Sequence, residues 1–310
     1  MNRQLVRFLA VAAVLVVPVP TPAQDAPAYT RKEDVIYGRK FGTALTMDVF
    51  TPKDKANGLG LIFCVSGGWF SSHEAINAAF VTPFLKRGYT VFAVVHGSQP
   101  RFTVPEILED MHRATRFVRA HAKDYQVDPD RLGIYGGSAG GHLSLMQGTA
   151  GKSGDPAAKD TVDRVSSRVQ CVACFFPPTD FLNWEREGDE MNYQKIRNPF
   201  KPALAFTETD KDTRMSTVTT DAKKITETMR QISPIYHVTK ESAPTLIIHG
   251  DKDGLVPIRQ AKVFVEKLKT EGVPAELIVR EGADHGWPTI GKDLDLFADW
   301  FDKHLKKVEK

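Results

Sequence analysis

Short, mostly apolar runs recur along the chain and predict buried strands. They cover residues 59–65, 89–95, 169–176 and 243–249. Runs of this kind are typical of strands covered on both faces of a sheet. Residues 45–50 instead alternate apolar and polar positions, the pattern of a half-buried strand. Two further segments have strand character, residues 131–135 and 275–280.

Helical spacing appears between these runs. In residues 103–125 the apolar side chains recur every three or four positions, which predicts a long amphipathic helix. Further helices are expected over residues 73–87, at residues 142–146, over 257–270 and over 290–306. Strands that alternate with helices require crossover connections, so the sequence predicts an α/β fold whose mostly parallel sheet carries helices on both faces.

One domain over residues 24–310 is the simplest organisation. Residues 24–32 are expected to be a mobile lead-in to the first strand. Residues 177–240 are rich in proline and polar residues and predict no regular elements. We expect this segment to be a cap or insertion above the carboxyl ends of the strands, where open α/β folds bind ligands.

The first 23 residues have the pattern of a signal peptide. Arg3 and Arg7 precede the apolar run 8–17, and a proline-rich stretch with small residues ends at Ala23. As a helix, the run would span about 15 Å, too short to cross a bilayer. The sequence therefore predicts export to the periplasm or the medium; the alternative is an uncleaved helix at the membrane surface.

Charge and cysteine content narrow the function classes. The 310 residues carry a formal net charge of +3, which favours neither nucleic acid nor an anionic membrane as a partner. Cys64, Cys171 and Cys174 lie in predicted buried strands. Residues 171 and 174 would face opposite sides of their strand, so we expect three unpaired core thiols and no metal site.

The pentapeptide Gly136-Gly137-Ser138-Ala139-Gly140 stands between a predicted strand and a predicted helix. A serine at such a turn is held on a strained backbone with its hydroxyl exposed, and the flanking glycines let the neighbouring elements approach closely. This context marks Ser138 as a candidate nucleophile.

A serine nucleophile needs a base and a carboxylate that orients the base. His285 follows the 275–280 strand and is the best-placed histidine. Asp253 and Asp251 both follow the preceding strand; we favour Asp253, because Asp251 comes directly after the strand and suits hydrogen bonding to the turn. The order Ser138, Asp253, His285 is that of α/β-hydrolases.

A tetrahedral intermediate also needs backbone donors for its oxyanion. The amide of Ala139 follows the nucleophile and is the first candidate. The loop after the 59–65 strand contains Gly67 and Gly68, whose amides are the other candidates. Trp69 and Trp287 lie close to these motifs in the sequence, and each would either bind substrate or pack in the core.

Together these segments resemble the α/β-hydrolase superfamily, in particular its esterases and lipases of the BD-FAE and hormone-sensitive-lipase-like type. The resemblance runs from about residue 40 to the C-terminus. It implies Ser138 as nucleophile, Asp253 as orienting acid and His285 as base. Val65 and Ser66 stand where the family usually has His and Gly, and residues 95–100 differ from the family pattern, so the resemblance implies no particular substrate.

The predicted function is an exported carboxylesterase that works through an acyl-enzyme, without cofactor or metal. Small or carbohydrate-linked esters are the expected substrates. Two alternatives stay open: a serine exopeptidase-like hydrolase, and a binding protein that keeps the fold without catalysis. The sequence gives no oligomeric state.

Overall fold

The computed structural model of the protein describes residues 28–191, 194–209, 212–213 and 215–306. The predicted signal peptide, residues 1–23, lies outside them. Among the helices of these ranges, none has both the length and the apolar character needed to cross a membrane.

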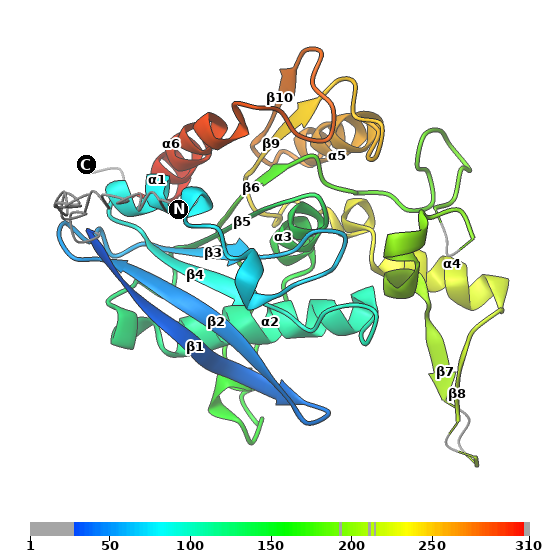
Figure 1. Ribbon diagram of the computed structural model, residues 1–310, viewed down its shortest axis with the longest axis horizontal. Coiled ribbons are helices and arrows are strands. Elements are labelled where there is room, and N and C mark those ends of the chain that lie inside the picture. The colour runs from blue at the N-terminus through cyan, green and yellow to red at the C-terminus, as the bar shows by residue number, and fades with distance from the viewer. Residues whose placement is uncertain (1–27, 192–193, 210–211, 214, 307–310) are drawn as a thin grey trace, which may run out of the picture.

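A twisted eight-stranded sheet forms the centre of the molecule (Figure 1). Its strand order is β1-β2-β4-β3-β5-β6-β9-β10. Pairing is antiparallel between β1 and β2 and between β2 and β4, and parallel across the rest of the sheet. The strands are β1 Tyr29–Lys40, β2 Thr43–Pro52, β3 Gly60–Cys64, β4 Thr90–Val95, β5 Leu132–Gly137, β6 Cys171–Phe175, β9 Thr245–Gly250 and β10 Ala275–Arg280.

Helices cover both faces of the sheet, as predicted. Residues of α2, α3 and α5 belong to the core on one face, and residues of α1 and α6 to the core on the other. Alternate positions of β3 divide between the two cores: Ile62 and Cys64 join the first, Leu61 and Phe63 the second. The helices are α1 Thr82–Lys86, α2 Val104–Ala120, α3 Ala139–Ala150, α5 Arg259–Thr270 and α6 Leu294–Leu305.

The insertion between β6 and β9 has more regular structure than its sequence suggested. It contains a short hairpin, β7 Thr207–Thr209 and β8 Ser216–Val218, and the helix α4 Ala222–Gln231. Figure 1 shows these elements projecting from one end of the molecule. In α4 the only fully buried side chain is Met229, so apolar runs were too sparse to reveal these elements.

Two further expectations are corrected. Residues 29–32 belong to β1 and not to a mobile lead-in; their side chains are largely exposed at the edge of the sheet, so they lack an apolar pattern. Residues 73–87 do not form one helix. They form 3₁₀ turns at His73–Ala75 and Ala78–Phe80, followed by the short α1.

The cysteines lie where the sequence placed them. All three are buried and unpaired. Cys171 and Cys174 belong to the cores on opposite faces of the sheet, and burial raises the pKa of the Cys64 thiol to about 12. Such thiols behave as small apolar side chains.

Candidate active site

Ser138 lies at the turn between β5 and α3 in a conformation that residues other than glycine rarely adopt, with φ 54° and ψ −119°. Its amide donates to the carbonyl of Phe175 at 2.9 Å, and its carbonyl accepts from the amide of His142 at 2.9 Å. These two bonds hold the strained residue between the sheet and the helix.

The glycines of the pentapeptide are required by close approach of the backbone. A Cβ on Gly136 would come within 2.6 Å of the backbone of Gly140. A Cβ on Gly140 would come within 2.7 Å of the carbonyl oxygen of Cys64. The helix can therefore start directly above β3 and β5 only because both positions lack a side chain.

Three side chains from different strand ends join in one hydrogen-bonded chain. His285 Nε2 lies 2.9 Å from Ser138 Oγ, and His285 Nδ1 lies 2.7 Å from Asp253 Oδ2. Because a carboxylate only accepts, Nδ1 carries the proton and Nε2 is left to accept from the serine hydroxyl. Since β5, β9 and β10 are parallel members of one sheet, their carboxyl ends meet at one edge.

Asp253 is buried and surrounded by donors. Its Oδ1 accepts from the amides of Leu255 and Val256 at 2.9 and 2.8 Å. Its Oδ2 lies 3.2 Å from Nε2 of His249, a fully buried ring. Burial raises the pKa of this carboxyl, but the hydrogen bonds from His249, His285 and Val256 outweigh it, so the pKa lies well below its usual range and Asp253 is ionised.

His249 was not among the residues predicted for the site. The structure places it against the carboxylate that holds His285. Its position four residues before Asp253, at the end of a buried strand, is a signal that the sequence contained.

A second aspartate joins the loops that carry the acid and the base. Asp284 Oδ1 accepts from the amides of Gly254 and His285 at 2.9 and 2.7 Å. Asp251 instead accepts from the amide of Gly282 at 2.7 Å and does not reach His285. The ring of His285 also packs on Phe176, with centroids 4.2 Å apart.

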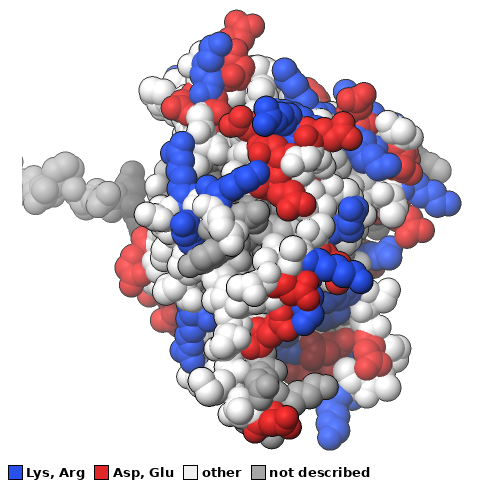
Figure 2. All heavy atoms as spheres, turned by 90° about the vertical axis from the view of Figure 1, so that its right-hand side faces the viewer, with Lys and Arg blue, Asp and Glu red and all other residues white. Residues whose placement is uncertain are grey.

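Ser138 opens into a cavity of about 560 Å³. One wall comes from the core of the fold, through Gly68, Trp69 and Ala139. The other comes largely from the insertion, through Pro178, Phe181, Trp184, Glu185, Asp189, Met191, Lys195, Ile196, Arg197 and Phe200. The insertion therefore contributes apolar and aromatic surface together with charges of both signs. Figure 2, which shows the face at that end of the molecule, has positive and negative side chains interspersed without a continuous patch of either sign.

The predicted oxyanion donors do not all remain free. Gly68 and Ala139 line the cavity beside Ser138, and Ala139 starts α3, where the first amides have no partner within the helix. Gly67 does not line the cavity, and its amide donates to the carbonyl of Phe70 at 3.0 Å. The assignment of Gly67 is therefore corrected, because a tight turn already uses its N–H.

The two tryptophans have different surroundings. Trp69 is buried and lines the cavity, and its Nε1 donates to His142 Nδ1 at 3.3 Å. Trp287 does not line the cavity; it packs on Phe175 and donates to Asp293 at 2.7 Å. Trp287 is therefore corrected to a packing residue between β6 and the chain leading into α6.

One cluster within the described ranges has the spacing of metal ligands, Glu33, Asp48 and His73. The guanidinium of Arg31 lies 2.6 Å from Asp48 and 3.3 Å from Glu33. A cation would have to displace this side chain, so the cluster is an ion-pair network. None of its residues lines the cavity that contains Ser138.

Known proteins similar to this chain include esterases. The chain is 28% identical over 245 residues to the probable carboxylic ester hydrolase LipM of Mycobacterium tuberculosis, a match that covers 78% of this chain and 52% of that protein. The chain thus spans about half the length of this curated relative.

Solved structures share the fold. A truncated carbohydrate esterase from gut microbiota superposes with a TM-score of 0.72 at 25% identity, covering 90% of this chain and 98% of that one. Esterase Est2 of Thermogutta terrifontis, bound to butyrate, superposes with a TM-score of 0.68 at 24% identity, covering 89% of this chain and 94% of that one. The model of the BD-FAE family matches residues 47–268 of the 310. The α/β-hydrolase arrangement of strands and the extent of this match show that the chain belongs to the BD-FAE family.

Proposed function

We propose that the protein is a serine carboxylic-ester hydrolase in which Ser138, His285 and Asp253 form the catalytic triad. The observation that carries the proposal is the unbroken chain of hydrogen bonds from Ser138 Oγ through His285 to Asp253 Oδ2. Ser138 lines a cavity of about 560 Å³, which is large enough for a small ester.

In the acylation step, Ser138 Oγ attacks the ester carbonyl while its proton passes to His285 Nε2. The carbonyl oxygen becomes an oxyanion, and the amides of Gly68 and Ala139 are the donors we assign to it. When the tetrahedral intermediate collapses, the leaving oxygen takes the proton from His285 and departs as an alcohol. Ionised Asp253 stabilises the imidazolium during these transfers.

Water then completes the cycle. It gives a proton to His285 and attacks the acyl carbon, and the second tetrahedral intermediate collapses with return of that proton to Ser138. The products are a carboxylic acid and an alcohol. All proton transfers use residues of the chain itself.

Carbohydrate-linked or other small esters are the substrates we propose. The cavity combines aromatic side chains, Trp69, Trp184 and Phe181, with charged ones such as Glu185 and Arg197. A structural relative described as a carbohydrate esterase supports the same substrate class. The basic and apolar pattern of residues 1–23 supports export, which the N-terminal sequence of protein recovered outside the cytoplasm would test.

The activity test compares the wild type with Ser138→Ala. The wild type should hydrolyse p-nitrophenyl acetate and react with a fluorophosphonate probe, and Ser138→Ala should lose both, with a decrease in kcat of about 10³-fold or more. Ser153→Ala removes an exposed serine hydroxyl outside the cavity and is the matched control.

Three other results would contradict the proposal. Absence of labelling in the wild type would favour a non-catalytic binding protein. Labelling that survives in Ser138→Ala would exclude this nucleophile. Cleavage of amino-acyl anilides in preference to esters would favour a peptidase.

A further inference from the structure

The loop that carries Gly68 has an unusual backbone. Gly68 has φ +56° and Trp69 has φ +62°. A bulky residue in the left-handed region costs about 1–3 kcal/mol and persists only where surrounding contacts hold it. The neighbours that hold Trp69 therefore decide the shape of the cavity wall beside Ser138.

Gln99 binds the carbonyl groups on both sides of Trp69. Its backbone amide donates to Trp69 O at 3.2 Å, and its side-chain Nε2 donates to Gly68 O at 2.5 Å. Because a trans peptide is planar, fixing the oxygen of Gly68 also fixes the direction of the Trp69 N–H on the opposite side. Gln99 thus sets the orientation of the Gly68–Trp69 peptide.

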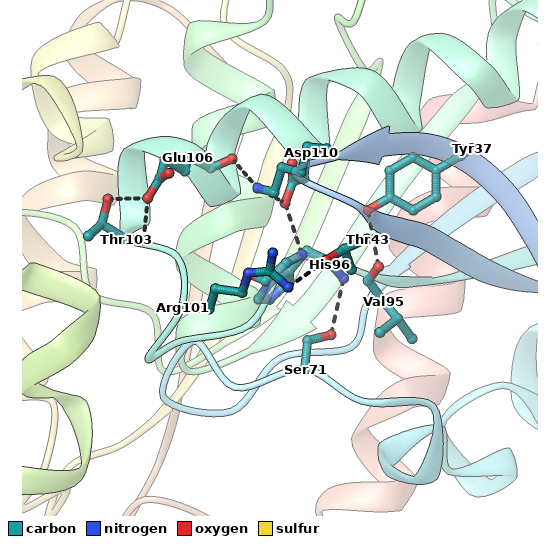
Figure 3. Close-up of polar contacts among 11 residues, drawn as sticks. Tyr37, Thr43, Ser71, Val95, His96, Arg101, Thr103, Glu106 and Asp110 are labelled. Atoms are coloured by element: carbon teal, nitrogen blue, oxygen red, sulfur yellow. Dashed lines mark hydrogen bonds and ion pairs between the residues drawn. The ribbon is translucent and has the colours of Figure 1, made fainter. Parts of the chain in front are cut away.

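The segment that carries Gln99 is itself firmly held. The amide of Gly97 donates to Asp110 on α2 at 2.9 Å, and Asp110 pairs with Lys40 at 2.6 Å. The amide of His96 donates to the hydroxyl of Ser71 at 3.2 Å. Figure 3 shows this stretch of chain between α2 and Ser71, with contacts from both sides.

The same side chain reaches the insertion. Gln99 Nε2 also donates to the carbonyl of Pro199 at 3.0 Å. The neighbouring ring of Phe200 fills the space that a side chain on Gly68 would need, since a Cβ there would lie 2.2 Å from the ring. One buried amide, only 2% exposed, therefore joins the loop beside Ser138 to the wall formed by the insertion.

We infer that Gln99 is a positioning residue for oxyanion stabilisation: by binding the carbonyl oxygen of Gly68 it holds this residue, whose own amide is the donor assigned above, in place beside the reacting carbonyl. The inference rests on the proposed ester hydrolysis. It concerns the transition state, because the donors act on charge that develops during the reaction.

The test replaces Gln99 with Met, which keeps the length of the side chain and removes its donor. We expect kcat for p-nitrophenyl acetate to fall about 10–100-fold with KM changed less than about threefold, since small displacements of oxyanion donors have effects of this size. Gln147→Met is the matched control, because Gln147 is a buried glutamine that does not line this cavity; its kcat should stay within about threefold of the wild type.

Rates are measured well below the melting temperature of each variant, so that a loss of folded protein is separated from a loss of kcat. An unchanged kcat in Gln99→Met would overturn the inference. A raised KM with an unchanged kcat would also overturn the inference, because it would mean that Gln99 only holds the insertion in place. A loss of activity that is explained entirely by the fraction of unfolded protein would also overturn the inference and assign Gln99 a structural role.

Gln99→Glu is the second variant, because it keeps the shape of the side chain while an ionised carboxylate has no hydrogen to donate. We expect its kcat relative to the wild type to fall as the pH is raised. A wild-type kcat at about pH 9, where even a buried carboxyl is largely ionised, would contradict the inference. If the wild type neither reacts with the probe nor hydrolyses esters, the proposed function fails. If the wild type does both and the Gln99 variants have the same kcat as the wild type, only this inference fails.

Discussion

Asp251 and Asp253 follow the same strand, yet their neighbours differ completely. Asp253 accepts from His285 through one oxygen and from the amides of Leu255 and Val256 through the other. Asp251 accepts from the amide of Gly282. Only Asp253 can fix the tautomer of the base, whereas Asp251 stabilises the turn after β10.

Asparagine substitutions should separate the two roles. In Asp253→Asn the amide can donate, so it favours the wrong tautomer of His285, and we expect kcat to fall about 10²–10⁴-fold. In Asp251→Asn the side-chain oxygen still accepts from Gly282, and kcat should stay within about tenfold of the wild type. Steady-state kinetics at neutral pH measure both, and a larger loss in Asp251→Asn would reverse the assignment of the acid.

Among the elements, α5 is joined to the start of the insertion mainly by Gln260, beside which Arg259 donates to the carbonyl of Asn183 at 2.7 Å. Gln260 is fully buried, and its Oε1 accepts from the amides of Thr179 and Asp180 at 2.9 and 2.7 Å. Its Nε2 donates to the carbonyl groups of Asn183 and Trp184 at 3.1 and 2.8 Å. This amide satisfies backbone groups that would otherwise be buried without partners, in the segment that forms one wall of the cavity.

Removing the amide should therefore be costly. We expect Gln260→Leu to lower the free energy of unfolding by about 2–4 kcal/mol, because it leaves several buried backbone groups without partners. Gln147→Leu is the control: within the described ranges the Nε2 of Gln147 has no hydrogen-bond partner and its Oε1 accepts a long bond from Thr115 at 3.5 Å, so its loss should change the free energy of unfolding by less than about 1 kcal/mol. Urea unfolding measures both, and equal losses would refute the role assigned to Gln260.

At the scale of the elements, the strands that are buried on both faces were predicted, whereas the start of the exposed edge strand β1 was not. β3 and β9 are buried along their whole length, so apolar runs reveal them. β1 lies at the sheet edge with mostly exposed side chains, and its pairing with β2 decides its structure. The elements of the insertion are similarly exposed and left no such runs.

At the scale of the whole molecule, several histidines are buried in their neutral form. Burial lowers the pKa of His96, His112 and His142 to about 4. In His142, Nε2 donates to the carbonyl of Ile232 at 2.7 Å, which leaves Nδ1 to accept from Trp69. A proton on Nδ1 would break this contact in the core.

The fold should therefore be sensitive to acid. An unfolded histidine takes up a proton near pH 6.5, while these folded ones resist until about pH 4. Their contribution to stability is complete above about pH 6.5 and is lost as the pH falls to about 4, at up to about 3 kcal/mol each. The lowered pKa of Asp253 adds a further loss below about pH 4.

Urea unfolding at a series of pH values between about 8 and 4 measures this dependence. His112→Asn, whose site lies outside the cavity, should show a shallower decline than the wild type. Stability that stays constant across this interval would contradict the neutral, buried state of these histidines.

The sequence by itself determined the order of the main strands and helices, the serine turn and the residues at three strand ends that meet in the structure. These features depend on local patterns: apolar runs, helical spacing, and glycines where the backbone is crowded. The tertiary structure decided which amides of the 66–70 loop are already used in a turn, that Trp287 packs away from the cavity, that His249 contacts Asp253, and that Gln99 binds the loop beside Ser138. Those outcomes depend on contacts between segments far apart in the chain. No local sequence pattern specifies which of these segments supplies the partner of a given hydrogen-bonding group.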